Sequence, residues 1–140
     1  MVKFNDYISI LIHQTDLSLT GLIKSKLAPL NLAPEQNLIM LLLWEQDGLS
    51  QNEIAEKLSK DKTNIARMVF NLEKKGFIRR DISQTDRRSL TVFLTDEGHE
   101  LGKKVIPITE EFNRTVCNGI TEEELKTVRE ILGKMRQNAK

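Results

Sequence analysis

The chain has few of the residues on which several kinds of site depend. Its 140 residues include one cysteine, Cys117, so an internal disulfide is impossible. The two histidines, His13 and His99, have no cysteine or histidine partner at ligand spacing, and we expect neither a metal nor another cofactor. Aromatic residues make up only 5% of the chain, which disfavours recognition of single-stranded nucleic acid by base stacking.

Long apolar runs and catalytic motifs are also missing. No stretch approaches the ~20 apolar residues that a membrane span needs, and the N-terminal segment lacks the basic start and uninterrupted apolar core of a signal peptide. We therefore expect a cytoplasmic protein. Because no glycine-rich phosphate loop, nucleophile–base arrangement or metal triad is present, we do not expect an enzyme.

Positive charge is instead concentrated in one part of the chain. The formal net charge is only +1, yet the segment from Lys57 to Arg88 holds ten Lys and Arg against four Asp and Glu, a local charge of +6. The rest of the chain therefore carries −5. Such a distribution is typical of a surface that binds a polyanion.

Hydrophobic spacing predicts a mainly helical α+β protein with the order α-α-α-α-β-β-α-α. Helix caps are expected at Ser50, Asp61, Thr95 and Thr121, and a buried run at Leu38–Trp44. We expect helices over about 5–28, 34–46, 51–58, 61–75 and 95–118, a last helix that starts at 121 and has its apolar stripe from Leu125 to Met135, and strands over 77–81 and 90–94.

Two short helices joined at Ser59-Lys60 and followed by a basic hairpin predict a winged helix-turn-helix, whose second helix enters the major groove of DNA. An Asn at the start of that helix can bind adenine, and a Thr can contact a base or a thymine methyl group. Basic residues and the start of the preceding helix suit phosphates. The candidate contacts are Ser50, Gln51, Lys60, Lys62, Thr63, Asn64 and Arg67. Alternatively, these residues serve only as helix caps and a solvated helix face.

The loop over 82–89 between the two strands carries Gln84-Thr85-Asp86-Arg87-Arg88. It contains neither Gly nor Pro to set a turn, so the two arginines suggest a guanidinium that enters a narrow minor groove. Asp86 and Arg88 are two residues apart and share a face in an extended chain, which would let the carboxylate orient the guanidinium. A simple surface ion pair is the alternative.

Four motifs resemble the MarR family of bacterial and archaeal transcription regulators: Leu58–Arg67, Leu72–Ile78, Asp86-Arg87-Arg88 and Leu94–Gly98. The resemblance covers essentially the whole chain. It implies a single domain over 1–140, with a DNA-binding lobe over 34–98 and dimerisation helices over 1–30 and 99–140. It also implies a homodimeric regulator, expected to be a repressor, that reads DNA with the 61–75 helix and places Arg88 in the minor groove. Two departures are Ser59, where Gly is common, and Gln84 or Thr85, where Pro often stands.

Independently of the family, the first helix and the last two carry more apolar surface than a small winged helix needs. Pairing these helices with those of a second copy across a two-fold axis would bury their apolar surfaces. It would also place two reading helices on successive half-sites of a pseudo-palindromic operator. An intramolecular helical layer is the alternative. A different function is also open, in which the basic face of the winged helix docks an acidic protein partner.

The resemblance further implies a pocket for a small phenolic or anionic ligand. The candidate lining residues are Tyr7, His13, Trp44 and Arg114. For each of them, the alternative is an ordinary role in the core or on the surface. Cys117 is not assigned a role, because the peroxide-sensing branch of the family uses a cysteine near the N-terminus and none precedes Cys117.

Overall fold

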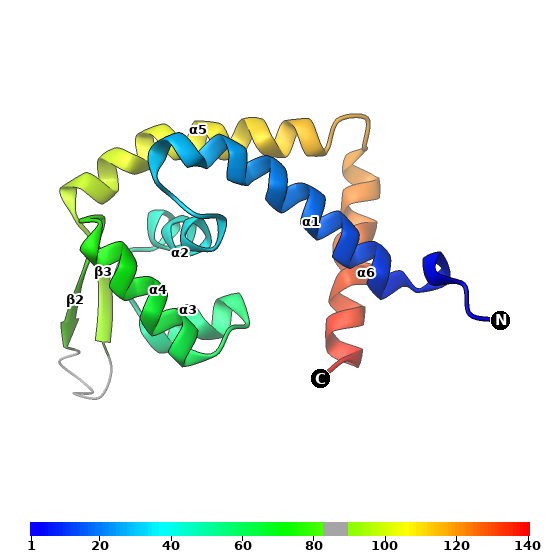
Figure 1. Cartoon of the computed structure of the whole chain (residues 1–140), viewed down its shortest axis with the longest axis horizontal. Helices are drawn as coiled ribbons and strands as arrows, with labels where there is room; N and C mark the ends of the chain where they lie inside the picture. The colour runs from blue at the N-terminus through cyan, green and yellow to red at the C-terminus, as the bar shows by residue number, and fades with distance from the viewer. Residues whose placement is uncertain (83–89) are drawn as a thin grey trace. The chain divides into compact units, whose positions relative to one another are not determined.

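The computed structural model of the protein describes residues 1–82 and 90–140 (Figure 1). Its helices are α1 (Ile8–Leu27), α2 (Pro34–Glu45), α3 (Gln51–Leu58), α4 (Lys62–Lys74), α5 (Asp96–Val116) and α6 (Glu122–Asn138), and its strands are β1 (Leu49–Ser50), β2 (Ile78–Ile82) and β3 (Leu90–Leu94). Short 3₁₀ turns, Phe4–Asp6 and Ala28–Leu30, flank α1. The mainly helical α+β fold and the order of the helices are confirmed.

The chain divides into two compact units, residues 1–109 and 110–140. The core lies in the first unit, where α2 contacts α1, α3, α4 and β3. The second unit holds the end of α5 and all of α6, and no residue of α6 is buried within the chain. None of the described helices is long and apolar enough to cross a membrane.

Local side-chain chemistry starts the helices around the turn of the helix-turn-helix. The Ser50 hydroxyl accepts the Glu53 N–H at 3.0 Å, and the Glu53 carboxylate accepts the Ser50 N–H at 3.2 Å. Asp61 accepts the N–H of Asn64 at 2.8 Å, and Thr121 opens α6 with a second capping box. These side chains satisfy N–H groups that a helix start leaves unpaired. These three predicted caps are confirmed, and so is the fourth, Thr95, whose hydroxyl accepts the N–H of Gly98 at the start of α5.

The turn between α3 and α4 places Ser59 in the left-handed region, with φ +54°. The next N–H, of Lys60, donates to the carbonyl of Ala55 at 3.0 Å and closes the end of α3. Glycine adopts this backbone conformation without strain, which explains why a Gly is common at this position in the family that the motifs resemble. The serine keeps the same turn at a small conformational cost.

Burial follows the predicted pattern on α4 and differs from it on α2. Ile65, Met68, Val69 and Leu72 are all buried on one face of α4. On α2, however, Leu38 is 42% exposed, so the prediction that the whole run to Trp44 is buried is wrong at its first residue. A helix surrounded on several sides still leaves one strip of its surface open, and hydropathy alone does not reveal which one.

The sheet has the antiparallel order β1-β3-β2. β1 was not predicted, because two residues are too few to display strand alternation; it exists through its pairing with β3, Leu49 opposite Val92. β2 begins at Ile78, one residue later than predicted. Phe77 belongs instead to the turn that ends α4, where its N–H donates to the carbonyl of Leu72 at 3.2 Å and Gly76 has φ +87°.

The first turn of α5 is fastened to two other elements. The Thr95 hydroxyl accepts the N–H of Gly98 at 3.0 Å and donates to the carbonyl of Gly76 at 2.6 Å, just before β2. The indole N–H of Trp44, in α2, donates to the carbonyl of Gly98 at 3.0 Å. The start of α5 is therefore held by both α2 and the turn that follows α4.

Candidate nucleic-acid interface

The outward face of α4 carries the predicted reading residues. Lys62, Thr63, Asn64 and Arg67 are all exposed in the first two turns of the helix. Because an α-helix turns by about 100° per residue, Thr63 and Arg67 lie on the side of α4 opposite the strip that faces the core. The helix therefore presents a polar, positively charged start to solvent while its other side is anchored in the core.

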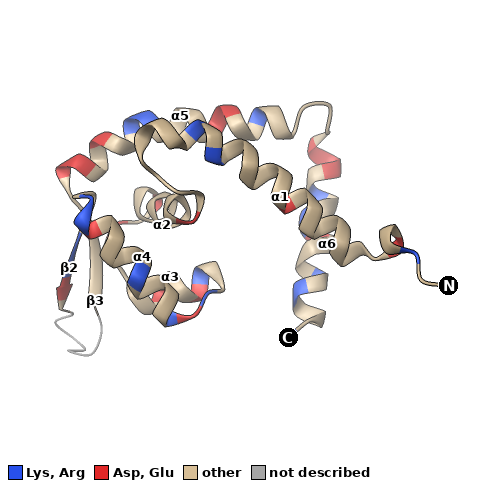
Figure 2. Ribbon diagram, viewed as in Figure 1, with Lys and Arg blue, Asp and Glu red and all other residues tan. Residues whose placement is uncertain are grey.

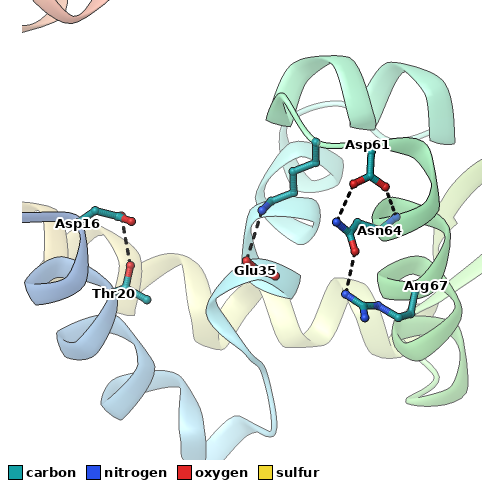
Figure 3. Close-up of polar contacts among 7 residues, drawn as sticks. Asp16, Thr20, Glu35, Asp61, Asn64 and Arg67 are labelled. Carbon is teal, nitrogen blue, oxygen red and sulfur yellow. Dashed lines mark hydrogen bonds and ion pairs between the residues drawn. The ribbon is translucent and has the colours of Figure 1, made fainter. Parts of the chain in front are cut away.

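A chain of hydrogen bonds links three side chains on this face (Figure 3). The Nδ2 of Asn64 donates to Asp61 Oδ2 at 2.8 Å, and Arg67 Nη2 donates to Asn64 Oδ1 at 2.9 Å. This arrangement fixes which end of the amide points towards the helix start. Because a primary amide has two N–H donors and two lone pairs, one donor and one acceptor of Asn64 remain for a base.

The Lys60 ammonium, a predicted phosphate contact, lies 3.3 Å from the Glu35 carboxylate of α2 (Figure 3). The side chains of Lys60 and Glu35 are 28% and 61% exposed. A solvent-exposed pair of this kind contributes under ~1 kcal/mol, so a phosphate can compete with it. Glu35 nevertheless balances part of the charge that Lys60 would offer to DNA.

Glu35→Gln is expected to strengthen duplex binding by about two- to fivefold at low salt, because the amide no longer competes with phosphate for Lys60. Fluorescence-anisotropy titration measures the change. Glu45→Gln is the matched control: it removes the same charge from an exposed position near the other end of α2. Equal affinities for the two variants would show that Glu35 does not restrain Lys60.

The start of α3 offers less side-chain chemistry than its sequence suggests. The Ser50 hydroxyl and N–H are both engaged in the capping box. Gln51 is partly buried, and its Oε1 is buried without a hydrogen-bond partner. A phosphate contact at this helix start would therefore come from backbone N–H groups rather than from these side chains.

Two arginines of β2 join the basic surface, and the sequence analysis did not single them out. Figure 2 shows the positive charge along this strand. The guanidinium of Arg80 donates to the Glu73 carboxylate at 3.0 Å, and that of Arg79 pairs with Asp81 and lies 4.6 Å from the ring centroid of Phe93. Two consecutive arginines in the first strand after the reading helix were the available signal.

The C-terminal end of α4 is tied to the beginning of α2. The Lys75 ammonium donates to the carbonyl of Asn31 at 2.7 Å and to the buried Gln36 side chain at 2.8 Å. Burial lowers the pKa of Lys75 below its usual value. Together with the pair between Lys60 and Glu35, this contact means that residues just before and just after α4 both contact the beginning of α2.

The predicted minor-groove residues Asp86, Arg87 and Arg88 lie outside the described residues. The strands on either side of their loop, β2 and β3, are among the described residues. β2 and β3 pair in antiparallel register, with Ile82 opposite Leu90.

Comparison with known proteins places this geometry in a family. The MarR family model matches residues 32–90. The organic hydroperoxide resistance transcriptional regulator of Bacillus subtilis is 31% identical over 76% of this chain and 73% of its own length. The chain belongs to the MarR family. This confirms the predicted family. It also confirms the prediction that the chain is a transcription regulator and not an enzyme.

Two further comparisons define the extent of the likeness. The transcriptional regulator TtmR of Methylorubrum extorquens is 38% identical over 59% of this chain, and the match spans 42% of TtmR. The crystal structure of the S. aureus MepR–DNA complex superimposes with a TM-score of 0.86 and 28% identity, covering 94% of this chain and 98% of that one. The likeness to MepR therefore includes nearly the whole fold.

A cavity of about 510 Å³ lies between α2 and the first half of α5 in this MarR family chain. Its lining includes Trp44, Asp47, His99 and Lys103. Of the predicted ligand-pocket residues, only Trp44 is among them. His99 was considered only as a metal ligand and Lys103 not at all, because nothing local in the sequence brings α5 against α2.

The other predicted pocket residues lie elsewhere. Tyr7 precedes α1 and His13 lies within it, and both are exposed. Arg114 belongs to the second unit, where its guanidinium donates to the Glu111 carboxylate at 2.8 Å. Cys117 is partly buried, with Sγ 3.8 Å from Asn113 Oδ1. Among the described residues, no group of three or more His, Cys, Asp or Glu could hold a metal ion.

Proposed function

We propose that this MarR family chain is a homodimeric, sequence-specific DNA-binding repressor of a pseudo-palindromic operator, which a small-molecule effector releases from the DNA. The observation that carries the proposal is the outward face of α4, polar and positively charged at its start and anchored in the core along its other side. Acting on chromosomal DNA would keep the protein in the cytoplasm.

Residues at the start of α4 would read base edges in the major groove. Asn64 keeps a free donor and acceptor for adenine, and Thr63 can contact a base or a thymine methyl group. Lys62 lies beside them, and Arg67 and Lys60 would bind phosphate, with backbone contacts from Ser50 and Gln51. That the similar MepR of S. aureus was crystallised with DNA supports this use of the fold.

The 82–89 wing is proposed to enter the minor groove. Arg88 would supply the inserted guanidinium, Asp86 would orient it, and Arg87 would bind the adjacent backbone. The antiparallel pairing of β2 with β3 supports a hairpin that projects this loop beyond the sheet. The single domain over 1–140, its lobe over 34–98 and its dimerisation segments over 1–30 and 99–140 belong to the same proposal.

A second copy of the chain is proposed to cover the apolar surfaces at both ends of the chain. Large apolar side chains are exposed along α1 and its approach and along α6: Tyr7, Ile8, Leu11, Ile12, Leu17, Leu22, Val128, Ile131 and Leu132. Water-exposed apolar side chains in such number are typical of a protein–protein interface. A two-fold dimer would also supply the second reading helix that a pseudo-palindromic operator requires.

The cavity between α2 and α5 is the proposed effector site. Its volume lies in the range of small-molecule sites. Trp44 offers a ring for stacking against a phenolic ligand, and Lys103 and His99 offer polar groups to an anion. Because α2 packs against α4 and Gln36 of α2 binds Lys75 at the end of α4, a ligand that shifts α2 would shift the reading helix.

Selection of bound duplexes from a random pool, with and without candidate phenolic acids, would identify the operator and test for an effector. The wild-type protein is expected to bind the selected duplex about 10³-fold or more tightly than a scrambled one at physiological salt. Asn64→Ala is expected to lose about tenfold or more of the discrimination at one base position per half-site.

Asn52→Ala makes the same chemical change at an exposed position on α3 and should leave discrimination unchanged. Fluorescence anisotropy on both duplexes compares the three proteins. If wild type and Asn64→Ala bind every duplex equally well, the chain does not read sequence. Duplex binding weaker than ~10⁻⁴ M would favour a module that docks an acidic protein.

A further inference from the structure

Phe70 is an exposed aromatic residue on the face of α4 that the proposed function assigns to DNA. Its surface is 46% exposed. At about 100° per residue, Phe70 falls within about 60° of Thr63 and Arg67 around the helix axis, opposite the buried strip. An apolar ring in the middle of a polar reading face has no role in the contacts proposed above.

Two cations lie close to this ring. The ammonium of Lys74 is 5.0 Å from the ring centroid, and the guanidinium carbon of Arg80 is 5.8 Å from it. Arg80 cannot leave easily, because the Glu73 carboxylate accepts both its guanidinium at 3.0 Å and its backbone N–H at 3.1 Å. Cation–π attraction explains why the cations approach the ring, but it leaves nearly half of the ring's surface open.

The occupant that suits this surface combines a small apolar group with negative charge close to it. The major groove of DNA has this combination, because the 5-methyl group of thymine projects into a groove bordered by phosphates. Phe70 lies seven residues after Thr63, roughly 10 Å along the helix axis. That distance is below the ~12 Å width of the groove, so both residues can be in the groove together.

We propose that Phe70 is a specificity-determining residue that packs its ring against the 5-methyl group of one thymine in each half-site, while Lys74 and Arg80 bind the flanking phosphates. The inference rests on the proposed function and adds to it an apolar base contact two turns beyond Thr63. A contact with deoxyribose would use the same apolar chemistry, but it would not depend on the methyl group.

Replacing the operator thymines one at a time with deoxyuridine removes only the methyl group and tests the proposal. For the wild-type protein, a single replacement in one half-site is expected to weaken binding by roughly fourfold, the value of one buried methyl-sized group, and the same replacement in both half-sites by roughly the square of that factor. Phe70→Ala should bind the original operator more weakly by at least that factor and show no further loss with deoxyuridine at that position. Phe70→Leu, which stays apolar, should retain part of the methyl dependence.

Leu38→Ala is the matched control, since Leu38 is also an apolar side chain with 42% exposure but lies on α2. It should keep the full deoxyuridine effect, and thermal melts should find all the variants folded. If wild type and Phe70→Ala lose the same factor with deoxyuridine at every position, the methyl contact is wrong. An affinity loss in Phe70→Ala that is independent of thymine would indicate a sugar contact and overturn the base reading. Failure of wild type itself to discriminate among duplexes would overturn the proposed function as well.

Discussion

Gly98→Ala is expected to lower the free energy of unfolding by about 3 kcal/mol, the upper part of the range for overpacking a closely packed site. A Cβ at this position would overlap the carbonyl oxygen of Phe77 and lie 3.2 Å from its carbonyl carbon. That oxygen cannot turn away freely, because it accepts the Thr95 N–H at 3.1 Å. The carbonyl of Gly98 also accepts the Trp44 indole N–H, so a shift of α5 would disturb α2.

Thermal and urea unfolding measure this effect, and a fall in Tm of roughly 10 °C corresponds to it. Gly21→Ala is the control, because it makes the same change inside α1, where an added Cβ meets nothing within 4 Å. Alanine favours a helix interior over glycine by up to about 1 kcal/mol, so this variant should be at least as stable as the wild type. Equal stability of the Gly98 variant and the wild type would mean that α5 does not approach Phe77 as closely as described.

Leu132→Lys is expected to abolish the dimer and to weaken operator binding by about 100-fold or more. Leu132 is 38% exposed within the chain, and the proposed interface would bury it against a second copy. An ammonium enclosed there without a partner is strongly unfavourable. Loss of the dimer would also remove the gain from binding two half-sites at once, which reaches 10²–10⁴-fold in linked systems.

Sedimentation velocity gives the oligomeric state, and anisotropy on the selected duplex gives the affinity. Gln137→Lys is the matched control: it adds the same single charge to α6 at an exposed polar position, on a different side of the helix from Leu132. It should remain dimeric and keep its affinity. A Leu132→Lys protein that still sediments as the same dimer as the wild type would rule out this face of α6 as the interface.

Features determined within a few neighbouring residues could be predicted from the sequence. The caps at Ser50, Asp61 and Thr121 were predicted because a cap needs only one side chain and an N–H three residues away. The buried face of α4 was predicted because its apolar spacing repeats over three turns. The winged helix followed from the order of these elements.

Features that depend on distant pairing could not be predicted. Strand β1 exists only because β3 lies beside it, and nothing near Lys60 reveals the carboxylate of Glu35, 25 residues away. The same is true of the approach of Gly98 to Phe77. These contacts are consequences of the packed core, and the hydrophobic pattern alone does not specify its geometry.

Phe70 is a different case, because a helical projection of α4 would have revealed it. The residue stands opposite the buried strip, on the same side of the helix as Thr63 and Arg67. It is absent from the predicted contacts because those were chosen among polar residues. An aromatic residue on the solvent side of an otherwise polar helix is the signal that was available.

The way α4 is held has a consequence for how such a protein can acquire a new operator. Its buried strip and the contact of Lys75 with α2 fix the position of the helix, and none of these contacts uses Thr63, Phe70 or Lys74. Substitutions at exposed positions usually change stability by less than about 0.5 kcal/mol. Three positions of the reading surface are therefore open to mutation at little cost to folding, so preference for DNA sequence can drift, or be redesigned, on an unchanged scaffold.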